Sequence, residues 1–181
     1  MNREEGLELL KQHLQNPNLV KHSLAVEACM RTLASRFDAD PEIWGLAGLL
    51  HDMDYAYTAD NPDLHGIKTA EMLEAYDLPP EIPHAIKAHN GKAGLDTLID
   101  KALYATDPTT GFITACALMH PDRKLASIDL TFMQKRFKSK AFARGASREQ
   151  MAECRLIDME LDEFLTVCLD AMSGIAQDLG L

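Results

Sequence analysis

The sequence has no surplus of positive charge and no long apolar run, and we expect no secretory signal at its start. Its 181 residues include 18 Lys and Arg against 28 Asp and Glu, a formal net charge of −10. General binding to nucleic-acid backbones needs positive charge that displaces counterions, so we expect none. The longest stretch without a charge, residues 108–119, is shorter than the ~20 residues that span a bilayer, so we expect no membrane contact. Residues 1–5 are acidic and precede no apolar core, so we expect a cytoplasmic protein.

Cysteine is scarce and is not arranged for disulfides or metal. The four cysteines are far apart and form no Cys-x-x-Cys pair; they are Cys29, Cys116, Cys154 and Cys168. Each lies among apolar residues at helical spacing, where a thiol usually acts as a small core side chain. We therefore expect four buried, reduced thiols.

Strand-like alternation of apolar and polar residues is also missing. Apolar residues instead recur at helical spacing, and helix-capping residues recur before them. We predict an all-α fold with a single domain over residues 1–181. The motifs described below lie within residues 17–110, and residues 111–181 form a helical C-terminal extension.

Capping signals place several helices. Asn2 with Glu5, and Ser147 with Gln150, have the spacing of capping boxes, and Asn61-Pro62 predicts a helix that runs to about Tyr76. We expect further helices over residues 43–50, 82–89, 95–107 and 110–119, one that starts at Ser127, and a long C-terminal helix over 161–175.

Six histidines and aspartates share the apolar faces or ends of these helices. They are His22, His51, Asp52, His65, His89 and Asp107. A lone inward histidine is usually a hydrogen-bonded core residue, and an aspartate at a helix end is usually a cap. Imidazole and carboxylate that face inward together are ligands that suit a divalent transition metal. The joint occurrence of six such positions favours a metal site.

The motifs around these positions resemble the HD family of metal-dependent phosphohydrolases. His22 lies in Lys-His-Ser-Leu-Ala-Val-Glu, His51-Asp52 in Gly-Leu-Leu-His-Asp, and Asp107 in Tyr-Ala-Thr-Asp. His65, in Leu-His-Gly, and His89, in Ala-Ile-Lys-Ala-His-Asn, look like the extra histidines of the binuclear branch, which includes enzymes that cleave dinucleoside polyphosphates. The resemblance implies an HD-type helical bundle with additional C-terminal helices.

The same resemblance implies a ligand set and an activity. His22, His51, Asp52 and Asp107 would hold one metal, while His65 and His89 would help to hold a second, with Asp52 as the bridge. The metals would be two divalent ions of Fe, Mn, Ni, Co or Zn, with Mg possible. The implied reaction is hydrolysis of a phosphomonoester or phosphoanhydride in a small substrate such as a nucleotide. Because ligation needs neutral imidazole, we expect metal affinity to weaken as pH falls through ~6.5.

One departure from the family pattern concerns phosphate binding. Many members have a glycine and a lysine shortly after the His-Asp pair, where this chain has Met53-Asp54-Tyr55. Asp54 is either a catalytic proton donor, a support for a metal ligand, or a solvated turn residue. Lys87 and Lys92 are candidates for phosphate contact, or solvated face residues. We expect His84, about 200° around its helix from Ile82, to face solvent.

Positive charge is concentrated in the C-terminal extension. Residues 123–148 carry a net charge of +7, and the rest of the chain −17. This segment is either a rim that attracts an anionic substrate or a solvated helix and loop.

Two other functions of the chain stay open: a di-iron oxygenase with the same fold and a sensing module without catalysis. A homo-oligomer is also possible.

Overall fold

The computed structural model describes residues 1–139 and 141–181, and it confirms the all-α fold: these residues form helices and no strand. The elements are α1 Arg3–His13, α2 Pro17–Arg36, α3 Pro41–Leu50, α4 Tyr55–Thr58, η1 Pro62–Leu64, α5 Ile67–Leu73, α6 Glu81–His89, α7 Leu98–Met119, η2 Leu125–Ser127, α8 Leu130–Phe137, α9 Arg148–Ala152, η3 Glu153–Ile157, α10 Leu161–Ser173 and α11 Ala176–Leu179.

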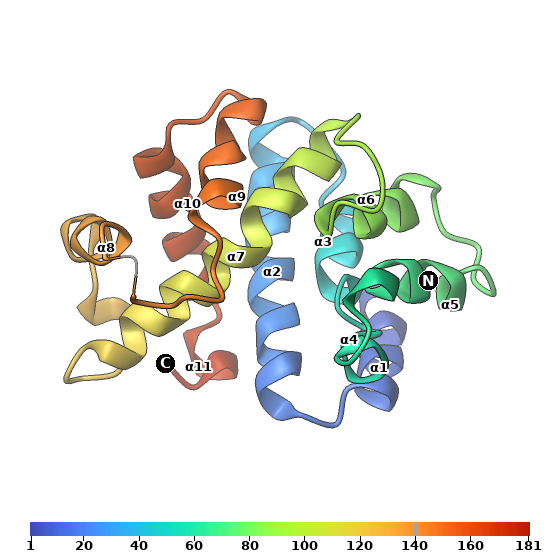
Figure 1. The fold of residues 1–181 in the computed structure, drawn as a ribbon, viewed down its shortest axis with the longest axis horizontal. Helices are drawn as coiled ribbons and strands as arrows, with labels where there is room; N and C mark the ends of the chain where they lie inside the picture. Colours follow the sequence, from blue (N-terminus) through green and yellow to red (C-terminus); the bar gives the residue numbers. More distant parts are fainter. Residues whose placement is uncertain (140) are drawn as a thin grey trace.

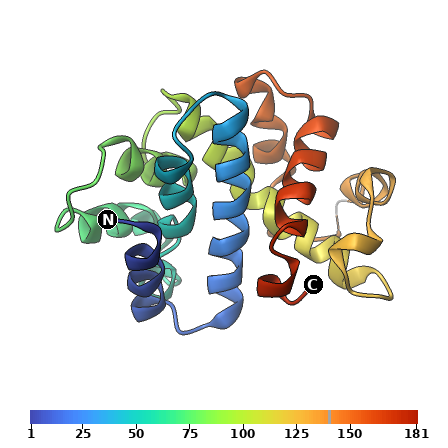
Figure 2. The same ribbon diagram turned by 180° about the vertical axis from the view of Figure 1, so that it is seen from behind.

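Two long helices, α2 and α7, form the centre of the molecule. In Figure 1 helices α1 and α3–α6 lie on one side of this pair and α8–α11 on the other, and the view from behind in Figure 2 agrees. One hydrophobic core runs through both sides and includes Leu10, Met30, Phe112 and Phe164, each fully buried. The central pair therefore carries side chains toward both halves of the fold.

The helix starts follow the capping chemistry in the sequence. Asn2 and Glu5 form a capping box at α1, and the Asp40 side chain accepts a hydrogen bond from Glu42 before Pro41 opens α3. Ser147 caps α9 as predicted, but no box closes there. The Gln150 side chain instead reaches the carbonyl oxygen of His89 at 3.5 Å.

The helix predicted from Pro62 to about Tyr76 is wrong. The chain forms the short η1, breaks at His65-Gly66, and begins α5 only at Ile67. Gly66 has a φ of +78°, and a Cβ there would lie 2.8 Å from the carbonyl oxygen of Ile86. The break places the backbone of Gly66 against α6, which a continuous helix would prevent.

The predicted separation of helices 95–107 and 110–119 is also wrong, because α7 continues through Pro108. Proline removes one backbone donor from the helix. The hydroxyl groups of Thr109 and Thr110 donate to the carbonyl oxygens of Ala105 and Asp107 in the same region. Asp107 therefore lies in the middle of a long helix rather than at its end.

Smaller differences lie in the C-terminal extension. Ser127 belongs to η2, and α8 starts after Asp129, whose side chain caps it. The predicted helix 161–175 ends two residues earlier, at Ser173.

The predicted buried thiols are confirmed, since all four cysteines are free and buried. None of the described helices has the length and apolar character needed to cross a membrane.

The close contact at Gly66 gives a test of the fold. We expect Gly66→Ala to destabilise the protein by about 2–4 kcal/mol, because the new methyl group meets the Ile86 carbonyl in a backbone region that side chains avoid. Gly91 has a similar φ of +70° but open space around its Cβ, so Gly91→Ala should lose only about 1 kcal/mol. Denaturant unfolding measures both variants, and equal losses would contradict the proposed contact.

Candidate metal centre

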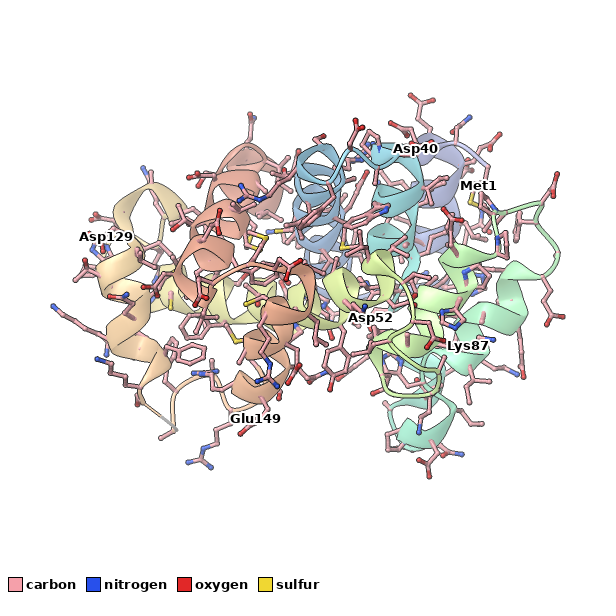
Figure 3. The ribbon with its side chains drawn as sticks, turned by 90° about the horizontal axis from the view of Figure 1, so that it is seen from above. Met1, Asp40, Asp52, Lys87, Asp129 and Glu149 are labelled. Atoms are coloured by element: carbon pink, nitrogen blue, oxygen red, sulfur yellow. The ribbon has the colours of Figure 1, made fainter. Side chains whose placement is uncertain are left out.

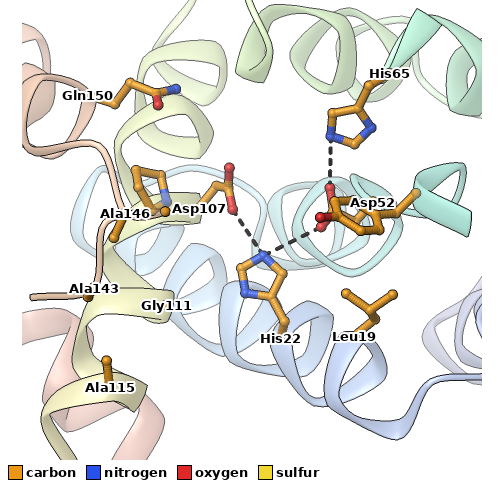
Figure 4. Close-up of a pocket in the computed structure, with 13 residues that line it drawn as sticks. Leu19, His22, Asp52, His65, Asp107, Gly111, Ala115, Ala143, Ala146 and Gln150 are labelled. Atoms are coloured by element: carbon orange, nitrogen blue, oxygen red, sulfur yellow. Dashed lines mark hydrogen bonds and ion pairs between the residues drawn. The ribbon is translucent and has the colours of Figure 1, made fainter. Parts of the chain in front are cut away.

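The six predicted ligands converge from five places in the chain. His22 comes from α2, His51 and Asp52 from the end of α3, His65 from the break before α5, His89 from the end of α6, and Asp107 from the middle of α7. Figure 4 shows four of them, His22, Asp52, His65 and Asp107, joined around one cavity. The structure thus brings together all six positions that the sequence selected.

The Asp52 carboxylate lies at the centre of the group. It is 5% exposed. Its Oδ1 lies 3.1 Å from Nε2 of His65, 3.4 Å from Nε2 of His51 and 3.8 Å from Nε2 of His89. Its Oδ2 lies 3.6 Å from Nε2 of His22. One carboxylate therefore faces four imidazole rings: Oδ1 faces those of His51, His65 and His89, and Oδ2 faces that of His22.

Asp107 closes the site on the α7 side. Its Oδ1 is 2.9 Å from Nε2 of His22 and 3.7 Å from Nε2 of His51. Two sets of ligand atoms each lie within 4.8 Å of one another: His22, His51 and Asp107 form one, and His51, Asp52 and His89 form the other. His65 adds to the second, since its Nε2 lies 3.3 Å from that of His89.

Hydrogen bonds at Nδ1 turn every ring so that Nε2 faces the centre. Nδ1 of His51 donates to the Gly48 carbonyl at 2.8 Å, and Nδ1 of His89 donates to the Ile86 carbonyl at 2.5 Å. Nδ1 of His22 lies 3.2 Å from Oγ1 of Thr110, a partner that the sequence reasoning missed. Fixing the proton on Nδ1 leaves the Nε2 lone pair for a metal.

Asp54 orients the fourth ring, and the idea that it is a solvated turn residue is wrong. The residue is fully buried. Its carboxylate accepts hydrogen bonds from Nδ1 of His65 at 2.7 Å and from the backbone N–H groups of Gly66 and Thr69 at 2.8 and 2.9 Å. These bonds hold its pKa below the usual range despite burial. Asp54 is therefore built to hold His65, and its oxygens are already engaged.

Nearby carboxylates change the titration of two histidines. Burial alone would lower the pKa of His51, but the charges of Asp52 and Asp107 outweigh burial and raise it to about 9. Burial likewise opposes the shift of His65, whose pKa is raised to about 10 by hydrogen bonds to Asp52 and Asp54. In the metal-free protein both rings are therefore protonated on both nitrogens, and positively charged, at neutral pH.

Three other members of the site, His89, Asp52 and Asp107, have lowered pKa values. Complete burial, together with the positive charge of His51, lowers the pKa of His89 to about 4. Burial would raise the pKa of Asp52 and Asp107, but the neighbouring imidazoles hold both well below the usual range. His89 is neutral and the two aspartates are ionised, the forms that a metal requires.

The residues present fit divalent metal. Nε2 of His51 is fully buried and has no hydrogen-bond partner among residues 1–139 and 141–181, and a buried nitrogen of this kind requires a partner. The donors are imidazole and carboxylate, which suit Fe, Mn, Co, Ni or Zn better than Mg.

A cavity of about 440 Å³ opens onto this cluster. His22, Asp52, His65 and Asp107 line its floor, and Tyr55 and Gln150 also line it. Leu19 and Pro108 also line it, and the rest of its wall comes from small residues that the sequence reasoning did not select. These are Gly111 and Ala115 of α7 and Ala143, Gly145 and Ala146 of the segment before α9.

The two lysines predicted to contact phosphate are not in this cavity, which corrects that assignment. Neither Lys87 nor Lys92 lines it, and the Lys92 ammonium is paired with Asp63 at 3.0 Å. In Figure 3 Asp52 lies between Lys87 on one side and Glu149, a residue of α9, on the other. Lys87 lies within α6, two residues before His89, and Lys92 lies three residues after the helix ends.

His84 faces away from the centre, as predicted, and its side chain meets solvent in part, being 34% exposed. The side chain is half-buried, with Nδ1 3.0 Å from the buried Asp100 carboxylate and Nε2 3.5 Å from Asp96. It joins α6 to the start of α7. Glu27, five residues after His22 in α2, is buried and bound by Arg3 and Arg31 at 2.6 and 2.9 Å.

Comparison with known proteins gives one family. The HD domain family model matches residues 19–120, which include all six predicted ligand positions. The chain is 34% identical over 90 residues to "Ribonuclease Y" of Clostridium kluyveri, which covers 50% of this chain and 18% of that protein. It is 26% identical over 166 residues to "Ribonuclease Y" of Lawsonia intracellularis, which covers 90% of this chain and 32% of that protein. The chain spans a third or less of these relatives, and no solved structure matches it.

The raised pKa values of His51 and His65 predict proton release on metal loading. At pH 7 both rings must lose a proton to bind metal, whereas His89 is already neutral. We expect about two protons to be released per fully loaded chain, and metal affinity to rise with pH up to about 9–10, above the ~6.5 expected for ordinary histidines. Calorimetry in buffers of different ionisation enthalpy counts these protons. Zero release at pH 7 would contradict the protonated state.

Proposed function

The chain belongs to the HD domain family, and on this premise we propose that it is a metal-dependent phosphohydrolase of the binuclear branch. The observation that carries the proposal is the pair of ligand sets that share His51 and meet at the Asp52 carboxylate. We propose a small phosphorylated substrate, such as a nucleotide, whose phosphomonoester or phosphoanhydride is hydrolysed.

In this proposal the ligand roles divide between two metals. His22, His51, Asp52 and Asp107 hold the first, and His65 and His89 hold the second with Asp52 as the bridge. Divalent metals bound there would supply a hydroxide near neutral pH and a clamp for phosphate oxygens. Hydrolysis forms a bond from the water oxygen to phosphorus, breaks the bond from phosphorus to the leaving oxygen, and transfers a proton to that oxygen.

The chain's own residues prepare the cavity for this chemistry. Asp54 holds the Nδ1 proton of His65, and Thr110 holds that of His22, so neither ring can turn its protonated nitrogen toward the cluster. Because both Asp54 oxygens accept other hydrogen bonds, we assign it a positioning role rather than the catalytic proton transfer considered from sequence. Tyr55, with its ring 5.8 Å from that of His65, borders the cavity and is 44% exposed.

The size of the cavity and the acidity of the chain support a small substrate. A volume of about 440 Å³ lies in the range of small-molecule sites. The net charge of −10 for the whole chain disfavours a long polyanion. The name of the relatives also supports nuclease-type hydrolysis of a phosphodiester. Both reactions place one phosphate at the cluster and differ in what lies beyond it.

The direct test is metal analysis of freshly purified protein, followed by phosphate release from nucleotides with each metal restored. We expect Asp52→Asn to lose metal and to reduce hydrolysis below detection, because the bridging charge is removed while the side-chain shape is kept. Full activity with metal retained in that variant would overturn the proposal.

Two histidines of α6 provide a matched pair. We expect His89→Ala to lower bound metal from about two to about one per chain and hydrolysis by at least about 100-fold, because a ligand of the second metal is lost. His84→Ala should keep the metal and the rate, although loss of the Asp100 partner should destabilise the fold by about 1–3 kcal/mol. Metal content, phosphate release and unfolding are measured side by side. Loss of metal from the His84 variant alone would contradict the assigned site.

A further inference from the structure

A second cavity lies against the first. It has a volume of about 470 Å³ and is lined by residues of the C-terminal extension. Ala143 and Ala146 line both cavities. Gly145, which lies between them in the sequence, lines the metal-site cavity. The wall that the cavities share therefore consists of small side chains, and it lies outside residues 19–120, which match the family.

The second cavity carries free positive charge. Lys138 and Arg144 line it and are exposed, and neither forms an ion pair with any acid in the described part of the chain. One acid, Glu149, also lines it, and its carboxylate accepts a hydrogen bond from Ser147 at 3.3 Å. The excess of positive charge suits an anion.

A third cation, Arg148, shapes the cavity rather than filling it. Its guanidinium donates to the carbonyl oxygens of Ala146 at 2.7 Å, Phe142 at 2.8 Å and Ala143 at 3.3 Å. It also stacks over the Phe112 ring, 4.6 Å from the centroid. These contacts occupy Arg148 and anchor the shared wall to α7, which also carries Asp107.

The far side of the wall is tied to the metal cluster. Gln150 lines the first cavity, and its amide lies within hydrogen-bonding distance of the carbonyl oxygen of His89. The segment that bears Arg144 is therefore held at a defined place beside the ligands. A substrate phosphate at the cluster has a cationic cavity as its immediate neighbour.

We propose that Lys138 and Arg144 form a second phosphate subsite, and that the substrate class is a nucleotide with a second phosphate beyond the one hydrolysed. This inference rests on the proposed function. It replaces Lys87 and Lys92 as the source of phosphate contact. It also assigns a local role to the +7 charge of residues 123–148.

The test compares phosphate release from a 5′-phosphorylated dinucleotide and from the matching 5′-mononucleotide. The metal-loaded wild type should have a KM about tenfold lower for the dinucleotide, the effect of one or two charge-assisted contacts. The double variant Lys138→Gln/Arg144→Gln should lose this preference while its kcat and its KM for the mononucleotide stay unchanged.

A matched control separates the subsite from general attraction of anions. Lys124→Gln/Lys135→Gln removes the same charge from the same basic segment, but neither residue lines either cavity. This control should keep the tenfold preference. Equal loss in both double variants, or no loss in either, would overturn the subsite.

A binding measurement keeps the two proposals distinguishable. If the wild type releases no phosphate with any metal, the proposed function fails, and the subsite is judged by calorimetric binding of the dinucleotide to metal-free protein. Binding that weakens about tenfold in Lys138→Gln/Arg144→Gln alone supports the subsite. Absence of binding, or equal affinity in all variants, overturns it.

Discussion

The buried charge of Asp52 is the constraint on which the rest of the structure depends. An ionised carboxylate that is 5% exposed is stable only when paired with positive charge or metal. The chain meets this requirement with four imidazoles, two of which have pKa values raised to about 9 and 10. Positive charge on these imidazoles thus balances the buried carboxylate in the metal-free protein.

Two of the imidazoles around Asp52 also complete the ends of their helices. The last carbonyl groups of a helix lack partners within the helix. In α3 the Gly48 carbonyl accepts from His51, and in α6 the Ile86 carbonyl accepts from His89. Each ligand ring therefore satisfies a helix end and is oriented by it. Removing either histidine would affect both metal binding and the end of its helix.

The sequence predicted the site better than the path of the chain between its parts. Helical phase placed His22, His89 and Asp107 on inward faces because each lies three or four residues from buried apolar neighbours. It could not predict the break at Gly66, which depends on a contact with Ile86, distant in sequence. The continuity of α7 through Pro108 was hidden for a similar reason, since its stability comes from packing on both sides of the centre. Burial of Asp54 was equally invisible, because its partners lie 11 to 15 residues away.

The local charge at the two cavities differs from the net charge of the whole chain. A net charge of −10 repels phosphates at long range, but salt screens such repulsion beyond about 8–10 Å. Inside the cavities the field is set by nearby groups, which are the clustered histidines and aspartates on one side of the Ala143–Ala146 wall and Lys138 and Arg144 on the other. Under the proposed function, Lys138 and Arg144 lie beside the reacting phosphate and favour a phosphorylated substrate, while the acidic remainder of the chain disfavours long polyanions.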